Sequence, residues 1–196
     1  MGAAVTGLAL AGLAGLPTLV VASAGFATGI AYDLRLKRTR WSWLPFALGI
    51  PLLPVYAWVG ATGSVPLAFA VLVPIAMVAG AALAVANAVA DVEGDERAGT
   101  ETIATSLGLD RARRSGAALQ GLVIVAALTS AALLGGDASW VAVGAGGSVI
   151  VLAGLGLGWS RTPATRRHGW EIQAVGLAIV AAGWLGALAA AATPAG

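Results

Sequence analysis

Four acidic residues lie between Asp91 and Glu96, in a chain that carries few charges elsewhere. Asn87, Asp91 and Asp95 follow one another at intervals of four residues, so on a helix their side chains stack on one face. Carboxylates at this spacing repel each other, and the free carbonyls of a helix C-terminus disfavour them further. A divalent cation removes both penalties, and Mg2+ takes oxygen ligands and shares phosphate oxygens. The cluster therefore predicts a Mg2+ site; the alternative is a solvated acidic loop whose spacing is accidental.

Basic residues near the cluster indicate what such a cation would hold. Arg97 lies two residues after Asp95, and Tyr32 and Lys37 lie at the end of another apolar segment. Acids that hold a metal, with bases beside them, form a receptor for a metal-bound diphosphate. We therefore expect Arg97, Lys37 and Tyr32 to contact a diphosphate. For Arg38, which follows directly, the alternative is a role in membrane topology and in contact with lipid headgroups.

The composition determines which kind of fold must position these residues. The chain has 196 residues, of which 59% are apolar and 10% charged, and its mean hydropathy is +0.89. A soluble domain carries about 25% charged residues, so too few are present to cover a water-facing surface. The chain contains no cysteine, which excludes disulfides and thiolate metal sites. The net charge of +2, without a basic arm, argues against nucleic acid as a partner. These features predict an integral membrane protein.

The apolar segments are long enough to cross a hydrocarbon layer of about 30 Å as helices. Residues 3–32 carry no charge and are interrupted by Pro17, so they form either one long span or two shorter ones; we prefer two, because Gly15 and Pro17 favour a break. We expect one all-α domain over 1–196, a polytopic transmembrane bundle of about seven helices. The predicted spans lie near 3–15, 17–33, 42–60, 66–90, 116–134, 140–159 and 171–192.

The distribution of basic residues predicts the orientation of the bundle. All eleven Lys and Arg residues lie in three predicted loops, 34–41, 91–115 and 160–170, whereas the intervening connections contain none. Basic and non-basic loops thus alternate, as alternating sides of a membrane require. The positive-inside rule places the three basic loops, and with them the acidic cluster, in the cytoplasm. We therefore expect a multi-pass protein of the cell membrane with its C-terminus outside.

Two stretches of this sequence resemble a known family. The run from Asn87 to Thr102, Asn-x3-Asp-x3-Asp-x3-Gly-x2-Thr, is closed by Leu107-Gly108 and resembles the second aspartate-rich motif of the UbiA superfamily of intramembrane prenyltransferases. The stretch from Tyr32 to Pro45 resembles that family's fourth helix and its exit. The resemblance covers essentially the whole chain, with the motifs in the family's order.

The resemblance implies a nine-helix fold whose central cavity binds Mg2+ and the diphosphate of a polyprenyl donor. The prenyl group is then transferred to a small-molecule acceptor, often an aromatic one. Matched by position, Asp91 and Asp95 would bind Mg2+, with Asn87 supporting them. Lys37 and Tyr32 would contact the diphosphate, and Lys37 would join the two aspartates in promoting ionisation of the donor. The bilayer, the donor and the acceptor are thus the expected partners.

The sequence departs from the family pattern at three points. Four residues, rather than the usual three, separate Tyr32 from Lys37, and Glu101 stands before Thr102 where a base is usual. No acid precedes Asp33, so the family's first aspartate-rich motif is absent, and by order the chain begins near the family's third helix. We therefore expect a partial version of the family fold. A second hypothesis is a catalytically silent homologue that acts as a membrane scaffold or a transporter-like bundle.

Overall fold

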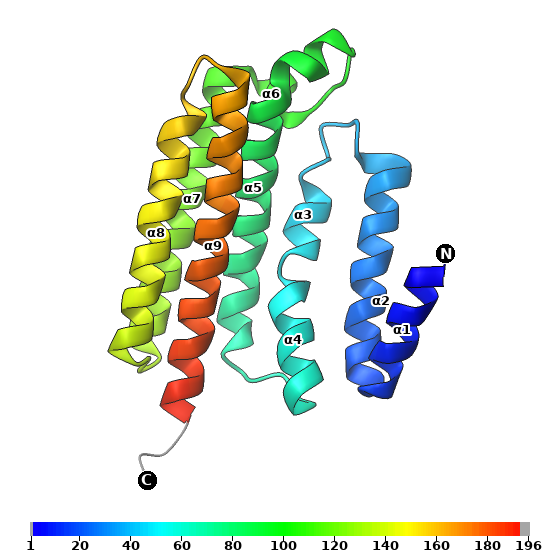
Figure 1. Cartoon of the computed structure of the whole chain (residues 1–196), viewed down its shortest axis with the longest axis vertical. Helices are drawn as coiled ribbons and strands as arrows, with labels where there is room; N and C mark the ends of the chain where they lie inside the picture. Colours follow the sequence, from blue (N-terminus) through cyan, green and yellow to red (C-terminus); the bar gives the residue numbers. More distant parts are fainter. Residues whose placement is uncertain (1, 193–196) are drawn as a thin grey trace.

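The structure is a computed structural model that describes residues 2–192, and this part of the chain consists of helices and connecting turns without strands (Figure 1). The elements follow in the order α1 (Gly2–Leu13), α2 (Leu16–Ala31), the π-helix η1 (Tyr32–Leu36), α3 (Leu44–Gly49), α4 (Leu52–Thr62), α5 (Phe69–Arg97), α6 (Ile103–Leu107), α7 (Leu109–Leu133), α8 (Ala138–Gly158) and α9 (Pro163–Ala192).

Within the described residues, six helical segments are long and apolar enough to cross a membrane. Two of them combine short elements, α2 with η1 and α3 with α4, whereas α5, α7, α8 and α9 each form one. The shorter α1 is also apolar and is separated from α2 at Gly15, whose φ of 116° is a conformation that favours glycine. The prediction of an all-α polytopic bundle is therefore confirmed.

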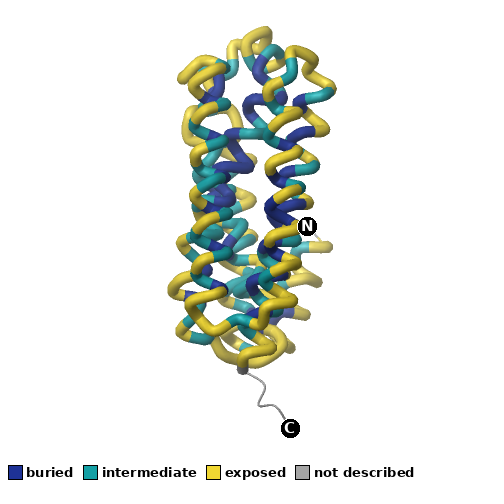
Figure 2. The backbone as a smooth tube through the Cα atoms, turned by 90° about the vertical axis from the view of Figure 1, so that its left-hand side faces the viewer, coloured by how far each residue is buried: buried dark blue, intermediate teal, exposed yellow. Residues whose placement is uncertain are grey.

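Helix α5 is the centre of the bundle. It contacts α7, α8 and α9 on one side and α3 on the other, while α2 lies farther out against α3 and α4, and α1 packs on α2 (Figure 1). Buried and exposed stretches alternate along the long helices (Figure 2), as expected for helices that pack along one face. The ends that join α2 to α3, α5 to α6 and α8 to α9 all lie at the same end of the bundle (Figure 1). This end contains the residues that the sequence singled out.

Glycine allows α8 and α9 to make the most extensive helix contact of the bundle. A Cβ atom at Gly147 would lie 2.8 Å from the Gly176 carbonyl oxygen, and one at Gly176 would lie 2.7 Å from the Val151 nitrogen. Backbones therefore approach each other directly, as small residues permit in membrane helices. The close contact fixes where the first turns of α9 lie relative to the other helices.

The helices extend beyond the predicted spans at the charged end. Helix α5 continues to Arg97 instead of ending near residue 90, and α9 begins at Pro163 instead of near residue 171. The hydropathy pattern indicates where the hydrocarbon layer ends, whereas Glu, Arg and Lys are good helix formers that prolong a helix into water. Proline at the first position of α9 is compatible with a helix start. The acidic cluster and Arg166 thus belong to helices and not to loops.

Candidate functional site

The last turns of α5 form one wall of a cavity of about 310 Å³. Asn87, Asp91 and Asp95 line it from one face of the helix, as their spacing predicts. The opposite wall comes from η1 and the segment after it and includes Tyr32 and Lys37. The remaining lining residues are Arg38, Ser42, Phe46, Ala84, Ala88, Ala98, Thr100 and Thr102. The structure thus brings together five of the six predicted site residues.

A π-turn explains how Tyr32 and Lys37 reach the same cavity. The Lys37 backbone N–H donates to the Tyr32 carbonyl oxygen at 2.9 Å, which closes a turn that is one residue longer than in an α-helix. On an α-helix, side chains five residues apart point in directions that differ by roughly 140°. The wider turn brings them back into register. The extra residue between Tyr32 and Lys37 that distinguishes this sequence is thereby accommodated.

Helix α3 supports the wall that carries Tyr32. The Tyr32 ring meets the Phe46 ring edge-on, with centroids 5.8 Å apart. Phe46 in turn lies against α5 at Gly80, where an added Cβ would lie 2.2 Å from the Phe46 carbonyl oxygen. A side chain at position 80 would therefore push α3 away. Lys37 extends into a more open region, 4.0 Å from Asp33, with both side chains largely exposed.

The chain turns back after α5 so that Thr102 faces the acidic residues. Gly99, with a φ of 63°, ends the helix, and the Thr100 N–H donates to the Asp95 carbonyl oxygen at 2.8 Å. This pair of features is the glycine-based helix end known as the Schellman motif. Thr102 then starts α6, and its buried hydroxyl lies close enough to Asp95 to donate to the carboxylate. The Gly and Thr that follow the two aspartates in sequence are therefore parts of the same site.

A second cavity, of about 670 Å³, lies on the other side of the acidic residues, between α5 and the start of α9. Asp91 and Asp95 line this cavity as well as the first one. Arg97 also lies here, and its Nε donates to the Glu93 carbonyl oxygen at 3.0 Å. Arg97 is thus the one predicted diphosphate contact that the structure does not place beside Tyr32 and Lys37.

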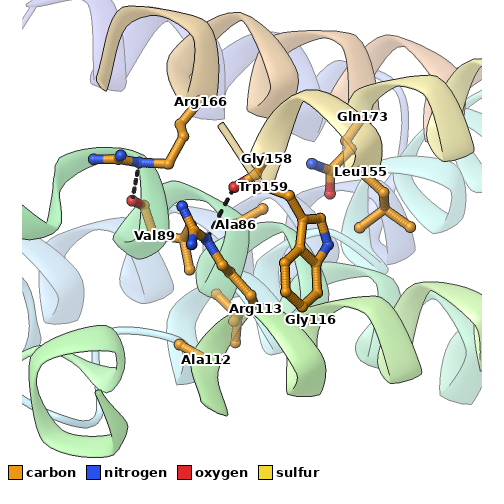
Figure 3. A pocket seen from close by; sticks show the side chains of 11 residues that line it. Ala86, Val89, Ala112, Arg113, Gly116, Leu155, Gly158, Trp159, Arg166 and Gln173 are labelled. Carbon is orange, nitrogen blue, oxygen red and sulfur yellow. Dashed lines mark hydrogen bonds between the residues drawn. The ribbon is translucent and has the colours of Figure 1, made fainter. Parts of the chain in front are cut away.

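Arg166 anchors α9 to α5 just below the acidic residues, and sequence reasoning had assigned it to a loop. The residue is only 2% exposed, its Nε donates to the Val89 carbonyl oxygen at 3.1 Å (Figure 3), and its guanidinium forms a bidentate ion pair with Glu93. It also donates to the carbonyl oxygens of Ser160 and Arg161. One feature of the sequence could have indicated this contact: Glu93 lies two residues from Asp91 and from Asp95, so on a helix it points to another face, where it needs a different partner.

Arg113 plays a similar structural part on α7. Its Nε donates to the carbonyl oxygen of Gly158, the last residue of α8, at 3.2 Å (Figure 3), and its Nη2 donates to the Ser160 carbonyl oxygen just beyond the helix at 2.7 Å. It also lies over the Trp159 ring, 5.8 Å from the ring centroid. Arg113 and Arg166 enclose a cavity of only about 20 Å³. Both side chains are therefore used to hold helix ends together.

The donor set of the first cavity fits a hydrated hard cation. Among the described residues, no three His, Cys, Asp or Glu side chains gather where they could hold a metal ion. Asp91 and Asp95 offer two carboxylates, and Asn87 and Thr102 add an amide and a hydroxyl oxygen to the same lining. Mg2+ is commonly held by one or two carboxylates and completes its shell with water and phosphate oxygens. The set is thus sufficient for Mg2+ brought in with a diphosphate.

A membrane-embedded helix bundle with a carboxylate-lined cavity at one end is the class of protein that the fold and the site define. The sequence matches the UbiA prenyltransferase family over residues 1–170, and the chain belongs to this family. The resemblance seen in the motifs is thereby confirmed. Neither a curated protein sequence nor a solved structure matches the chain. Membrane prenyltransferase activity is the general property of the family.

Proposed function

We propose that the chain binds a prenyl diphosphate together with Mg2+ and transfers the prenyl group to a small, aromatic acceptor. The observation that carries this proposal is the first cavity, where the carboxylates of Asp91 and Asp95 face Tyr32 and Lys37. Acidic groups on one wall and a base on the other are what a metal-bound diphosphate requires. Membership of the UbiA prenyltransferase family supports the same reaction class.

Each side chain has a role in this reaction. Asp91 and Asp95 would hold Mg2+, which when bound supplies positive charge to the diphosphate oxygens. Lys37 stabilises the negative charge that grows on the diphosphate as the bond between its oxygen and the prenyl carbon breaks. The Tyr32 hydroxyl donates to a diphosphate oxygen. Asn87 orients the carboxylates and their bound water from one turn earlier on α5.

The apolar part of the cavity suits the prenyl chain. Ala84 and Ala88 precede the aspartates on the same face of α5, and Phe46 faces them from α3. An allylic cation forms on the prenyl group when its bond to the diphosphate oxygen breaks. These apolar groups do not react with that cation, and they keep water away from it. The acceptor then forms a bond to the prenyl carbon, the diphosphate is released, and the proton that the acceptor loses passes to the released diphosphate or to water.

We further propose that the site opens toward the cytoplasm of a cell whose plasma membrane holds the protein. The three basic loops of the sequence lie at the end of the bundle that carries the site (Figure 1). The positive-inside rule assigns that end to the cytoplasm. A donor diphosphate, which is water-soluble at its charged end, would enter from this side.

The test is release of diphosphate from a prenyl diphosphate by membranes that contain the chain. We expect release that requires Mg2+, stops on chelation and rises when an aromatic acceptor is added. Membranes lacking the chain provide the background. Release no faster than this background would contradict the proposal and favour the catalytically silent homologue.

The π-turn predicts how the site responds to changes at Lys37. Lys37→Met removes the charge opposite the carboxylates, so we expect the rate of diphosphate release to fall about tenfold to hundredfold. Arg35→Met, which removes a base from the same exposed turn, should leave the rate nearly unchanged. Deletion of the exposed Leu34 turns the π-turn into an α-turn and keeps Tyr32 and Lys37 in register.

The deletion should therefore retain the release rate within about threefold, which is less than 1 kcal/mol of activation free energy. A loss in the Leu34 deletion as large as that of Lys37→Met would show that the π-turn itself, and not the alignment it produces, is required.

A further inference from the structure

Asp91 has a partner from a distant part of the chain. The Arg167 Nη2 atom on the first turns of α9 lies 3.1 Å from Asp91 Oδ1, although 76 residues separate the two in sequence. The side chains are 64% and 46% exposed, so this ion pair lies in water and is exchangeable. Arg167 and His168 line the second cavity together with both aspartates.

The neighbouring Arg166 determines where Arg167 lies. Arg166 is buried and bound to Val89 and Glu93 of α5, so the first turns of α9 are held firmly against α5. Arg167, one residue later, extends from this fixed point along an exposed path. Arg166 therefore holds α9 against α5, whereas the Arg167 side chain extends into water from a backbone position that this contact fixes.

The charges that face Asp91 decide what the Arg167 side chain does. In the absence of a cation, Asp91 and Asp95 repel each other, and Arg167 offsets part of that repulsion. A bound cation takes the same carboxylate oxygens and competes with the guanidinium for them. Lys37 and Arg38 line the first cavity, whereas Arg97, Arg167 and His168 line the second, and of these Arg167 is the residue that pairs with Asp91.

We infer that Arg167 exchanges partners: it holds Asp91 while the metal site is empty, and it binds the diphosphate once the cation has taken Asp91. This inference rests on the proposed function. The planar guanidinium offers paired N–H donors that match phosphate oxygens, so arginine binds a diphosphate more specifically than lysine does. Asp91 lines both cavities, so a diphosphate held beside it in the first cavity would meet Lys37 on one side, and the released Arg167 would reach it past Asp91 from α9.

The exchange has a signature that a purely structural arginine would not produce. Arg167→Gln removes a competitor for Asp91, so the affinity for a divalent cation alone should rise, by about threefold for an exposed pair. The same change removes a charged donor to the diphosphate, so the affinity for diphosphate in saturating Mg2+ should fall by about tenfold. Arg167→Lys should preserve much of the competition and recover only part of the diphosphate affinity.

The experiment measures both affinities on the purified full chain in detergent. Mn2+ serves as the probe for the metal site, with binding followed by electron paramagnetic resonance, and inorganic diphosphate is titrated in saturating Mg2+ by calorimetry. Arg161→Gln, an exposed base just before α9, is the matched control and should change neither affinity. Thermal melting of each variant checks that the fold is retained.

Opposite shifts for Mn2+ and diphosphate in Arg167→Gln support the exchange. Shifts in the same direction, or none, overturn it, even if the wild-type chain binds both ligands and releases diphosphate. A wild-type chain that binds no Mn2+, or binds it equally well after Asp95→Asn, overturns the metal site of the proposed function and the exchange with it.

Discussion

Asp95→Asn is expected to lower the rate of Mg2+-dependent diphosphate release by about a hundredfold or more. The substitution keeps the shape of the side chain and removes the negative charge that attracts the cation, so the loss reports on charge rather than on packing. Asp91→Asn should have an effect of similar size, but it also breaks the ion pair with Arg167. Asp95 therefore gives the cleaner measurement.

Glu96→Gln is the matched control for this prediction. Glu96 follows Asp95 directly on α5 and is exposed. In the part of the chain that the structure describes, it lines neither the first nor the second cavity. The same loss of one charge at this position should change the rate less than twofold. If the loss in Asp95→Asn arises from weaker metal binding, raising the Mg2+ concentration should restore part of the rate. Equal effects at positions 95 and 96 would argue against a site on the Asp91 face of α5.

The acidic face of α5 could be predicted because it follows from periodicity alone. Residues at intervals of four share a helix face in any environment, and the apolar segments are long enough to be recognised as membrane-spanning helices. The opposite wall of the first cavity, which carries Tyr32 and Lys37, was harder to predict. Tyr32 and Lys37 share a cavity only because of the π-turn, and an i, i+5 spacing on an ideal helix would have separated them.

The basic residues show a different limit of sequence reasoning. The positive-inside rule treats every Lys and Arg as a loop charge, and it therefore grouped Arg166 with Arg167. In the structure the first is buried against α5 and the second is exposed beside Asp91. Adjacent residues on a helix point in directions about 100° apart, and only the packing of α9 on α5 decides which one turns inward. Such tertiary information is not contained in composition or charge pattern.

Arg166→Met should produce the largest loss of stability among single substitutions at this end of the bundle. The substitution removes the donors to Val89 and Ser160 and the ion pair with Glu93, while methionine fills much of the same volume. A hydrogen bond from a charged donor typically contributes about 1.5–3 kcal/mol, and several are lost together, so we expect a loss of about 3 kcal/mol or more. Because Glu93 is 43% exposed and can turn to water, we expect the lower end of that range. Titration with SDS in mixed micelles measures the change in free energy of unfolding.

A substitution of Glu93, the other member of the ion pair, tests which partner is essential for stability. Glu93→Gln removes the counter-charge, but the amide oxygen of Gln can still accept from the guanidinium, and the carbonyl oxygens of Val89, Ser160 and Arg161 still solvate the buried charge, so the loss should stay near about 1 kcal/mol. Arg114→Met, an exposed base on α7, controls for the loss of a positive charge and should be nearly neutral. If Glu93→Gln destabilised the protein as much as Arg166→Met, the ion pair would be the main contribution. The smaller loss we expect from Glu93→Gln assigns most of the stability to the hydrogen bonds between the guanidinium and the backbone. Those bonds depend on the arginine, and they are what hold α9, and with it Arg167, against the acidic end of α5.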